Sequence, residues 1–193
     1  MGHKTRNPTF ETENDARVKN SLVAFGSLGG LLGMAMGAGA GLARRAPRSA
    51  AMAAVVGLVL GGLAGAGATA VVLPTALRTR SVNQDDLIRP FLVHAGLWGP
   101  LGAAGGLAFG LGAGRRGSSL ATATLGGAVG ALLGSAAYDL IGGLAFPFAR
   151  TDTPISRTWL TRLIARLCVA LGAVSGATLG TRDRPATPRP AAL

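Results

Sequence analysis

The sequence predicts an all-α, polytopic membrane protein with about five transmembrane helices. Of the 193 residues, 49% are hydrophobic, only 14% are charged, and 31 are glycine. The charges are clustered, which leaves uncharged stretches longer than the ~20 residues that cross a bilayer as a helix. Leu, Val, Ile, Met and Phe are interleaved with the glycines, which argues against a soluble low-complexity linker.

The first segments follow from the charge pattern. Residues 1–20 are polar and of mixed charge, and they are predicted to form an N-terminal tail without a signal peptide. Asp, Glu, Lys and Arg are absent from three stretches, which are 20–43, 49–77 and 90–114. Each stretch is therefore predicted to be a spanning helix.

Two further spans complete the prediction. The stretch 117–149 contains a single charge, Asp139. The segment 158–180 is predicted as a fifth helix, although it carries two arginines near its start. The remaining segments are a polar loop over 78–89, a second loop over 150–157 and a Pro- and Arg-containing tail over 181–193 that is expected to be disordered.

An internal duplication is predicted from self-similarity. A shift of 70 residues aligns Leu22 with Leu92 and Gly26 with Gly96, and each copy contains a span, a basic turn and a second span. The copies form two tandem hairpins, 21–77 and 90–149. Because each unit crosses the membrane twice, both copies enter in the same direction, which predicts a parallel repeat. The fifth helix lies outside the duplication and is expected to pack across it.

Glycines recur every fourth residue within the spans. This spacing places them on one helical face and is typical of glycine zippers, where a neighbouring backbone packs closely. The predicted helix-packing glycines are Gly29, Gly33, Gly37, Gly41, Gly57, Gly61, Gly65, Gly102, Gly106, Gly110, Gly114, Gly126, Gly130, Gly134, Gly172, Gly176 and Gly180. In the duplication, Gly57, Gly61 and Gly65 match Gly126, Gly130 and Gly134.

Three polar residues form the predicted intramembrane site: Asp139, Arg166 and His94. An acid within a span costs roughly 2.5 to 3.5 kcal/mol at the helix centre on insertion scales, so Asp139 is expected to have a partner. Arg166 lies at a similar depth from the same membrane side, and an Asp139–Arg166 ion pair that fixes the fifth helix is expected. A proton- or ion-responsive site, or an Arg166 side chain that snorkels to the surface, are the alternatives.

Enzyme chemistry finds little support, so the protein is predicted not to be an enzyme. Ser135 and Ser175 have no histidine nearby in the sequence, and Cys168 is the only cysteine. No catalytic, cofactor-binding or metal-binding residues are predicted, and no cofactor is expected. The net charge of +11 comes from arginines in turns and tails without an aromatic-interleaved patch, so no nucleic-acid partner is expected.

The function expected from these features is that of a structural or assembly component of a membrane. The alternative is a small channel or transporter whose site contains Asp139, Arg166 and His94. Expected partners are the lipid bilayer and either further copies of the chain or other membrane protein subunits. The abundance of Arg over Lys, with many Ala and Gly, indicates a GC-rich bacterial genome and hence a bacterial cytoplasmic membrane. Basic residues are nearly balanced between the two sides, and a cytoplasmic N-terminus is expected because translocating the acid-bearing tail is unfavourable.

Overall fold

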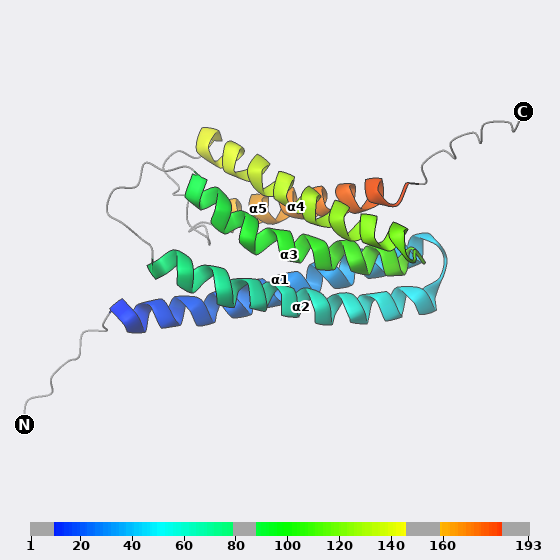
Figure 1. Ribbon diagram of the computed structural model, residues 1–193, viewed down its shortest axis with the longest axis horizontal. Helices are drawn as coiled ribbons and strands as arrows, with labels where there is room; N and C mark the ends of the chain where they lie inside the picture. The colour runs from blue at the N-terminus through cyan, green and yellow to red at the C-terminus, as the bar shows by residue number, and fades with distance from the viewer. Residues whose placement is uncertain (1–9, 79–87, 146–158, 183–193) are drawn as a thin grey trace, which may run out of the picture.

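The computed structural model of the chain is a bundle of five helices, and it describes residues 10–78, 88–145 and 159–182. The helices are α1 (Phe10–Ala43), α2 (Pro47–Arg78), α3 (Ile88–Gly112), α4 (Ser118–Ala145) and α5 (Trp159–Gly180). Consecutive helices run in opposite directions along the long axis (Figure 1). The α1–α2 turn, the α3–α4 turn and the last residue of α5 therefore lie at the same end of the bundle, which we call the turn end.

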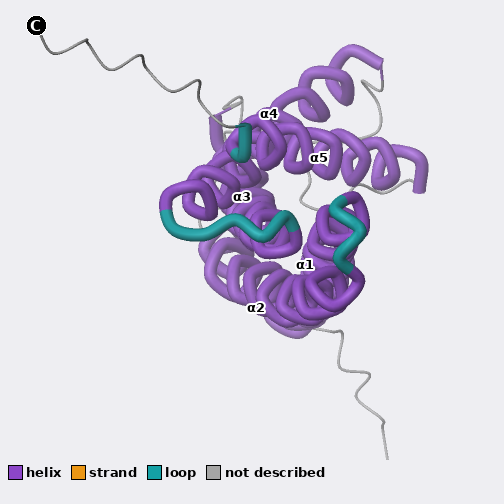
Figure 2. The backbone as a smooth tube through the Cα atoms, turned by 90° about the vertical axis from the view of Figure 1, so that its right-hand side faces the viewer, coloured by secondary structure: helices purple, strands orange, loops and turns teal. Residues whose placement is uncertain are grey.

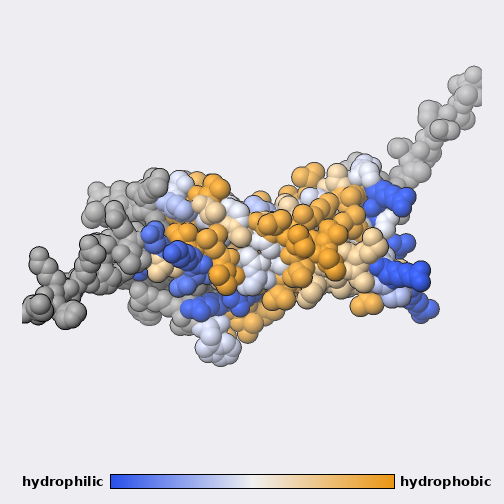
Figure 3. Space-filling view, turned by 90° about the horizontal axis from the view of Figure 1, so that it is seen from below, coloured by the Kyte–Doolittle hydropathy of each residue, from blue (hydrophilic) through white to orange (hydrophobic). Residues whose placement is uncertain are grey.

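All five helices are long and apolar enough to cross a membrane. The candidate spans are Asp15–Ala43, Pro47–Ala76, Phe91–Gly112, Ser118–Gly142 and Trp159–Gly180. Large apolar side chains such as Leu63, Leu133 and Leu171 are exposed on the outer faces. Figure 3 shows this apolar surface between more hydrophilic ends. The predicted all-α, multi-pass membrane fold with five helices is confirmed.

The first helix begins earlier than the predicted membrane span. α1 starts at Phe10, so it includes the second half of the segment that was predicted as a polar tail. Acidic residues come first in this stretch and basic residues follow, ending at Arg17 and Lys19. Acids near a helix N-terminus interact favourably with the helix dipole, and acid–base pairs four residues apart stabilise a helix. The charged stretch is therefore a helical extension of the first span.

The third helix lies at the centre of the bundle. It packs against all four other helices, whereas α1 pairs mainly with α2 and α4 pairs mainly with α5. Figure 2 shows α3 between these two pairs. Leu97 and Leu101 of α3 are completely buried, and the Trp98 ring packs edge-on against Phe25 of α1 with 5.4 Å between ring centroids.

Both turns at the turn end have the same helix cap. In the first, the amide of Ala46 donates to the carbonyl of Gly41, and Arg45 adopts a left-handed conformation with φ of 55°. In the second, the amide of Arg115 donates to the carbonyl of Gly110, and Gly114 has φ of 67°. This is the Schellman arrangement, which satisfies carbonyls at a helix C-terminus. Gly114 is therefore a turn residue, and its predicted place in a helix-packing stripe is wrong.

Glycine backbones contact each other between α1 and α2. A Cβ atom at Gly61 would overlap the carbonyl oxygen of Gly29, and one at Gly57 would overlap that of Gly33. The contact continues where Gly65 faces Phe25, Gly37 faces Ala53 and Gly41 faces Ala50. Only a residue without a side chain allows such a close backbone approach. We call this contact the α1–α2 seam.

A second seam of the same kind joins α4 and α5. Gly126, Gly130 and Gly134 face the carbonyl oxygens of Gly176, Gly172 and Cys168, and Gly180 faces that of Thr122. The glycines of α4 that match those of α2 in the sequence therefore face α5 and not the other helix of their own hairpin. The α3–α4 contact uses a different face of α4, where Gly102 meets Gly127 and Ala131, Gly106 meets Ala123 and Gly127, and Gly110 meets Leu120.

Several predicted segments lie outside the described residues. They are the loop 150–157, most of the loop 78–89, the tail 181–193 beyond Arg182, and the beginning of the N-terminal tail. The predicted duplication also stays a prediction, because the packing of α4 differs from that of α2.

Candidate functional site

The candidate site lies where the first turns of α3 meet the last turns of α4, away from the turn end. Its α3 member is His94, which is only 3% exposed. His94, Leu97, Trp98 and Leu101 are spaced three or four residues apart and are all buried, so they share the inner face of α3. The packing of the central helix on all sides therefore places the imidazole inside the bundle.

The α4 member is Asp139. Its neighbour Tyr138 is buried, while the Asp139 side chain is 28% exposed. His94 Nδ1 lies 2.9 Å from Asp139 Oδ1, a hydrogen bond between the side chains of two residues that are 45 positions apart in the sequence. When the carboxylate is ionised, the ring N–H at Nδ1 is the donor and the carboxylate oxygen is the acceptor. The bond links α3 to α4.

Two buried polar atoms on α4 have no hydrogen-bond partner among the described residues. They are Oδ2 of Asp139 and Oγ of Ser135. Residues four apart lie one above the other on a helix, so both atoms belong to the same face of α4. An unsatisfied buried polar group costs ~1–3 kcal/mol, and such groups are found where a water, an ion or a proton has a place.

An aromatic ring adjoins the pair. The rings of Tyr138 and His94 are 6.5 Å apart between centroids, with an interplanar angle of 62°. His94 is three residues inside the candidate span that begins at Phe91, and Asp139 is three residues before the end of the span at Gly142. Both residues therefore lie within the candidate spans of α3 and α4, toward the same end of the bundle.

The structure brings together His94 and Asp139 and leaves Arg166 apart from them. Arg166 lies on the exposed face of α5, whereas the inward face of this helix carries Thr161, Ala165, Val169, Ala173 and Ala177. Asp139 bonds His94 through Oδ1, and its Oδ2 has no partner among the described residues. The expected Asp139–Arg166 ion pair is therefore wrong. Successive residues of a helix are rotated by 100° about its axis, so Arg166 lies outside the inward face that its neighbour Ala165 belongs to.

The structure also shows whether Ser135 is placed to act as a nucleophile. Ser135 is on the same helix as Asp139, but its Oγ makes no hydrogen bond to His94 or to any other described residue. The one bond of the imidazole to a side chain on α4 goes to the carboxylate. The hydrogen bond from nucleophile to base that activates a catalytic serine is thus not formed in the described residues.

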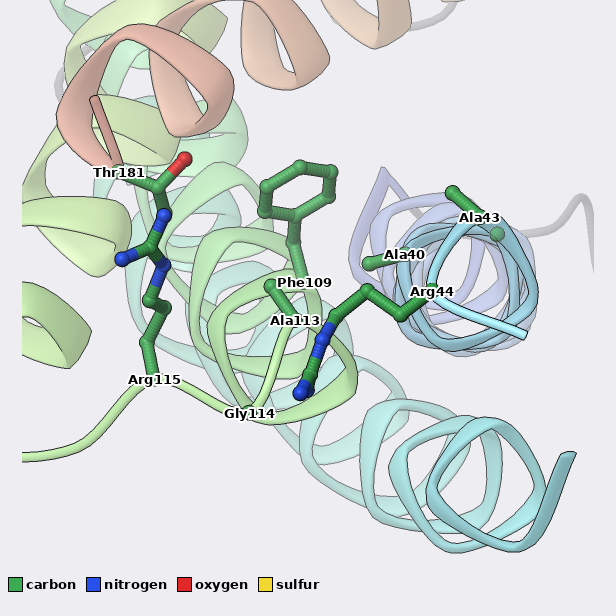
Figure 4. A pocket seen from close by; sticks show the side chains of 9 residues that line it. Ala40, Ala43, Arg44, Phe109, Ala113, Gly114, Arg115 and Thr181 are labelled. Atoms are coloured by element: carbon green, nitrogen blue, oxygen red, sulfur yellow. The ribbon is translucent and has the colours of Figure 1, made fainter. Parts of the chain in front are cut away.

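A second polar feature lies at the turn end and was not anticipated from the sequence. Arg44 of the first turn, Arg115 of the second turn and Thr181, which follows the last residue of α5, line one cavity, where the Arg115 side chain lies beside Thr181 and the Arg44 side chain extends to Gly114 (Figure 4). The two basic turns are visible in the sequence, but their position next to the end of α5 depends on how the fifth helix packs.

No family model, no curated protein and no solved structure matches the chain.

Proposed function

We propose that the protein is a non-enzymatic structural or assembly component of a membrane, held together by glycine-zipper packing. The observation that carries this proposal is the direct backbone contact along the α1–α2 and α4–α5 seams. A scaffold is expected to fill its glycine seams with backbone, whereas a conductor needs a hydrated path between helices. Glycine seams of this kind are typical of helices that pack tightly and permanently.

Two further features support the proposed internal repeat and self-association. Both hairpin turns carry the same Schellman cap, as expected of duplicated units. The outer face of α5 exposes Leu163, Leu167 and Leu171 together with Arg166. An arginine on a membrane-facing surface is costly, so a second copy of the chain or a headgroup reached by snorkelling is its natural neighbour. The proposed location is a bacterial cytoplasmic membrane with the N-terminus in the cytoplasm.

The second candidate function is that of a small proton or ion conductor. The observation that favours it is the His94–Asp139 pair with the unsatisfied Asp139 Oδ2 and Ser135 Oγ on one face of α4. Chains of Asp, Glu and His residues serve as proton relays in membrane proteins. The site of this candidate function consists of His94, Asp139 and Ser135, whereas the site predicted from the sequence contains Arg166 in place of Ser135.

Flux through reconstituted liposomes separates the two functions. The parent protein, Asp139→Asn and the control Asp15→Asn would be reconstituted at equal density, and proton and potassium flux would be followed with entrapped dyes between pH 5 and 8. Asp15 is exposed near the start of α1, so its substitution should not affect a site between α3 and α4. We expect all three to behave like empty liposomes.

A flux in the parent that Asp139→Asn abolishes and Asp15→Asn retains would contradict the scaffold proposal and support the conductor. The same samples, labelled with donor and acceptor dyes, test self-association by energy transfer as the lipid-to-protein ratio is raised. Energy transfer that persists on dilution is expected for a stable oligomer. Loss of transfer at the lowest protein density would contradict self-association.

A further inference from the structure

The hydroxyl of Ser135 differs in its bonding from the threonine hydroxyls of the helices. Thr69, Thr124 and Thr178 each donate to the carbonyl four residues earlier, at 2.8, 2.9 and 2.7 Å. This is the usual way in which a helical serine or threonine satisfies its hydroxyl. Ser135 is only 1% exposed, yet its Oγ makes no such bond and has no other partner among the described residues. Its hydroxyl is therefore available to a group outside its own helix.

Ser135 and Asp139 continue the face of α4 that packs against α3. Ala123, Gly127 and Ala131 contact α3 at intervals of four residues. The next two positions at this spacing are Ser135 and Asp139. Side chains four residues apart have Cβ atoms ~5–6 Å apart, and the two side chains make no hydrogen bond to each other. One small group between them can therefore contact both the hydroxyl and the carboxylate.

The contact between α3 and α4 becomes looser toward these two residues. A Cβ atom at Gly106 or Gly102 would overlap a backbone carbonyl of α4. At Gly99, which is closer to His94 along α3, a Cβ atom would meet only the side chain of Leu132, at an ordinary contact distance of 3.5 Å. Side chains and not backbone thus fill the contact here, and a small occupant needs only side-chain adjustment.

The carboxylate of Asp139 has no permanent positive charge beside it. Its one ion-pair partner among the described residues is His94, which is charged only when it is protonated. Arg166 lies on the exposed face of α5 and does not reach it. With a neutral imidazole, the site therefore carries one negative charge within a membrane span, which is costly until a positive charge compensates it.

Three kinds of occupant differ in what they satisfy. A proton, on His94 or on the carboxyl group, removes the charge but leaves the Ser135 hydroxyl without a partner. A water molecule can bridge the two oxygens but leaves the charge uncompensated. A cation between Asp139 Oδ2 and Ser135 Oγ does both, because carboxylate and hydroxyl oxygens are the ligands that hard cations take.

We propose that Asp139 and Ser135 bind one alkali-metal cation between α3 and α4. A monovalent ion matches the single carboxylate, whereas a divalent ion would leave a net positive charge within the span. Among the described residues, no group of three or more His, Cys, Asp or Glu could hold a metal ion of another kind. Water completes the coordination from the side on which Asp139 is exposed. His94 donates to Oδ1 and so fixes the carboxylate with Oδ2 left for the ion.

This proposal rests on the site of the second candidate function but not on transport through it. A cation that stays bound would strengthen the contact between α3 and α4 in a scaffold, whereas a conductor would release it. Equilibrium binding and flux therefore fail separately. A protein that binds the ion without flux is a scaffold with an ion site, and a protein without either contradicts the ion site alone.

The test is the thermal midpoint of the full chain in detergent at pH 8, which favours a neutral imidazole. Choline chloride is replaced stepwise by sodium chloride at constant ionic strength, because choline has the same charge but is too large to lie between the two oxygens. We expect a saturating rise of the midpoint, by roughly 5–10 °C when sodium exceeds its dissociation constant a hundredfold.

Two variants and two controls locate the ion. Ser135→Ala and Asp139→Asn each remove one ligand and should lose the rise that sodium causes. Thr124→Ala removes a hydroxyl of the same helix that is already bonded to the Leu120 carbonyl, and it should keep the rise. Asp15→Asn removes an exposed acid near the start of α1 and should keep it too.

The outcomes that would overturn the proposal are distinct. Equal midpoints of the parent in sodium and in choline would exclude the cation. A full rise in Ser135→Ala would show that sodium binds elsewhere. A midpoint that changes with pH but not with sodium would assign the site to a proton.

Equilibrium dialysis with radioactive sodium provides a second measurement that does not depend on any variant. The parent should bind about one sodium ion per chain, and an excess of unlabelled sodium should displace it. Midpoints in choline identify a variant that does not fold, in which case the binding to the parent decides. Binding of less than about 0.1 ion per chain at saturating sodium would overturn the proposal.

Discussion

At the residue scale, the pairing of His94 with Asp139 determines how a carboxylate is accommodated inside the bundle. One oxygen of Asp139 is bonded to the ring and the other is buried without a partner among the described residues. Breaking a buried pair by removing one member leaves the other unsatisfied, whereas replacing both by apolar groups avoids that cost. This asymmetry makes the contribution of the pair measurable.

His94→Leu should lower the free energy of unfolding by about 1–3 kcal/mol, because it leaves both oxygens of Asp139 without a partner. The double variant His94→Leu with Asp139→Leu should recover most of this loss. The measurement is the unfolding transition in detergent, followed by circular dichroism. Arg166→Gln serves as the control and should change stability by less than about 0.5 kcal/mol, because its side chain is exposed. A loss from Arg166→Gln as large as that from His94→Leu would contradict the assignment of the partner.

The sequence predicts which residues belong to this site, but it does not predict which of them are in contact. The positions of His94 and Asp139 near the same membrane side follow from counting residues along the spans. The choice of partner does not, because it depends on how each helix is rotated about its axis. The regular spacing of Ala165, Val169, Ala173 and Ala177 contains this information for α5, since a stripe of small residues marks the packed face. Arg166 lies beside that stripe and therefore outside it.

At the scale of the helices, the glycines decide which pairs of elements come closest. α4 carries small residues on two faces, so it contacts α3 through Ala123, Gly127 and Ala131 and α5 through Gly126, Gly130 and Gly134. The sequence predicts that these glycines pack against a helix. It does not identify the neighbour, because a glycine has no side chain that prefers one partner over another.

Gly61→Ala should destabilise the protein by about 1–3 kcal/mol, the usual range for overpacking, because the new Cβ would overlap the carbonyl oxygen of Gly29. Gly67→Ala in the same helix is the matched control, since a Cβ there meets nothing within 4 Å. It should leave stability unchanged or raise it by up to about 1 kcal/mol through helix propensity. Thermal midpoints in one detergent compare the two. Equal midpoints for both variants would rule out the α1–α2 seam as a tight backbone contact.

At the scale of the whole molecule, an odd number of spans places the start of the first helix and the end of the last helix on opposite sides of the membrane. α1 begins at the end opposite the turn end, and α5 finishes at the turn end (Figure 1). The number of spans was predictable because each is bounded by charged turns. The central position of α3 was not, because contacts between the two hairpins are not encoded in hydropathy.

Reporters fused before residue 1 and after residue 193 should therefore give opposite signals, with the N-terminal fusion cytoplasmic. An alkaline phosphatase and a fluorescent protein, which are active on opposite sides of a bacterial cytoplasmic membrane, provide the readout. A fusion after Arg48, at the start of α2, is an internal control and should report the same side as the C-terminal fusion. Cytoplasmic signals from both termini would contradict five complete spans. A cytoplasmic C-terminus alone would reverse the orientation.

The two glycine seams also affect the entropy of assembly. In a membrane each helix forms before it associates, so the backbone freedom of its glycines is already lost when two helices meet. Packing leucine side chains at such a contact would restrict rotamers at roughly 0.5–1 kcal/mol for each residue, whereas glycine has no rotamers to restrict. The pairs Gly29–Gly61 and Gly130–Gly172 thus bring two backbones together without ordering side chains at these positions. The dispersion energy of these contacts is retained without that entropic loss.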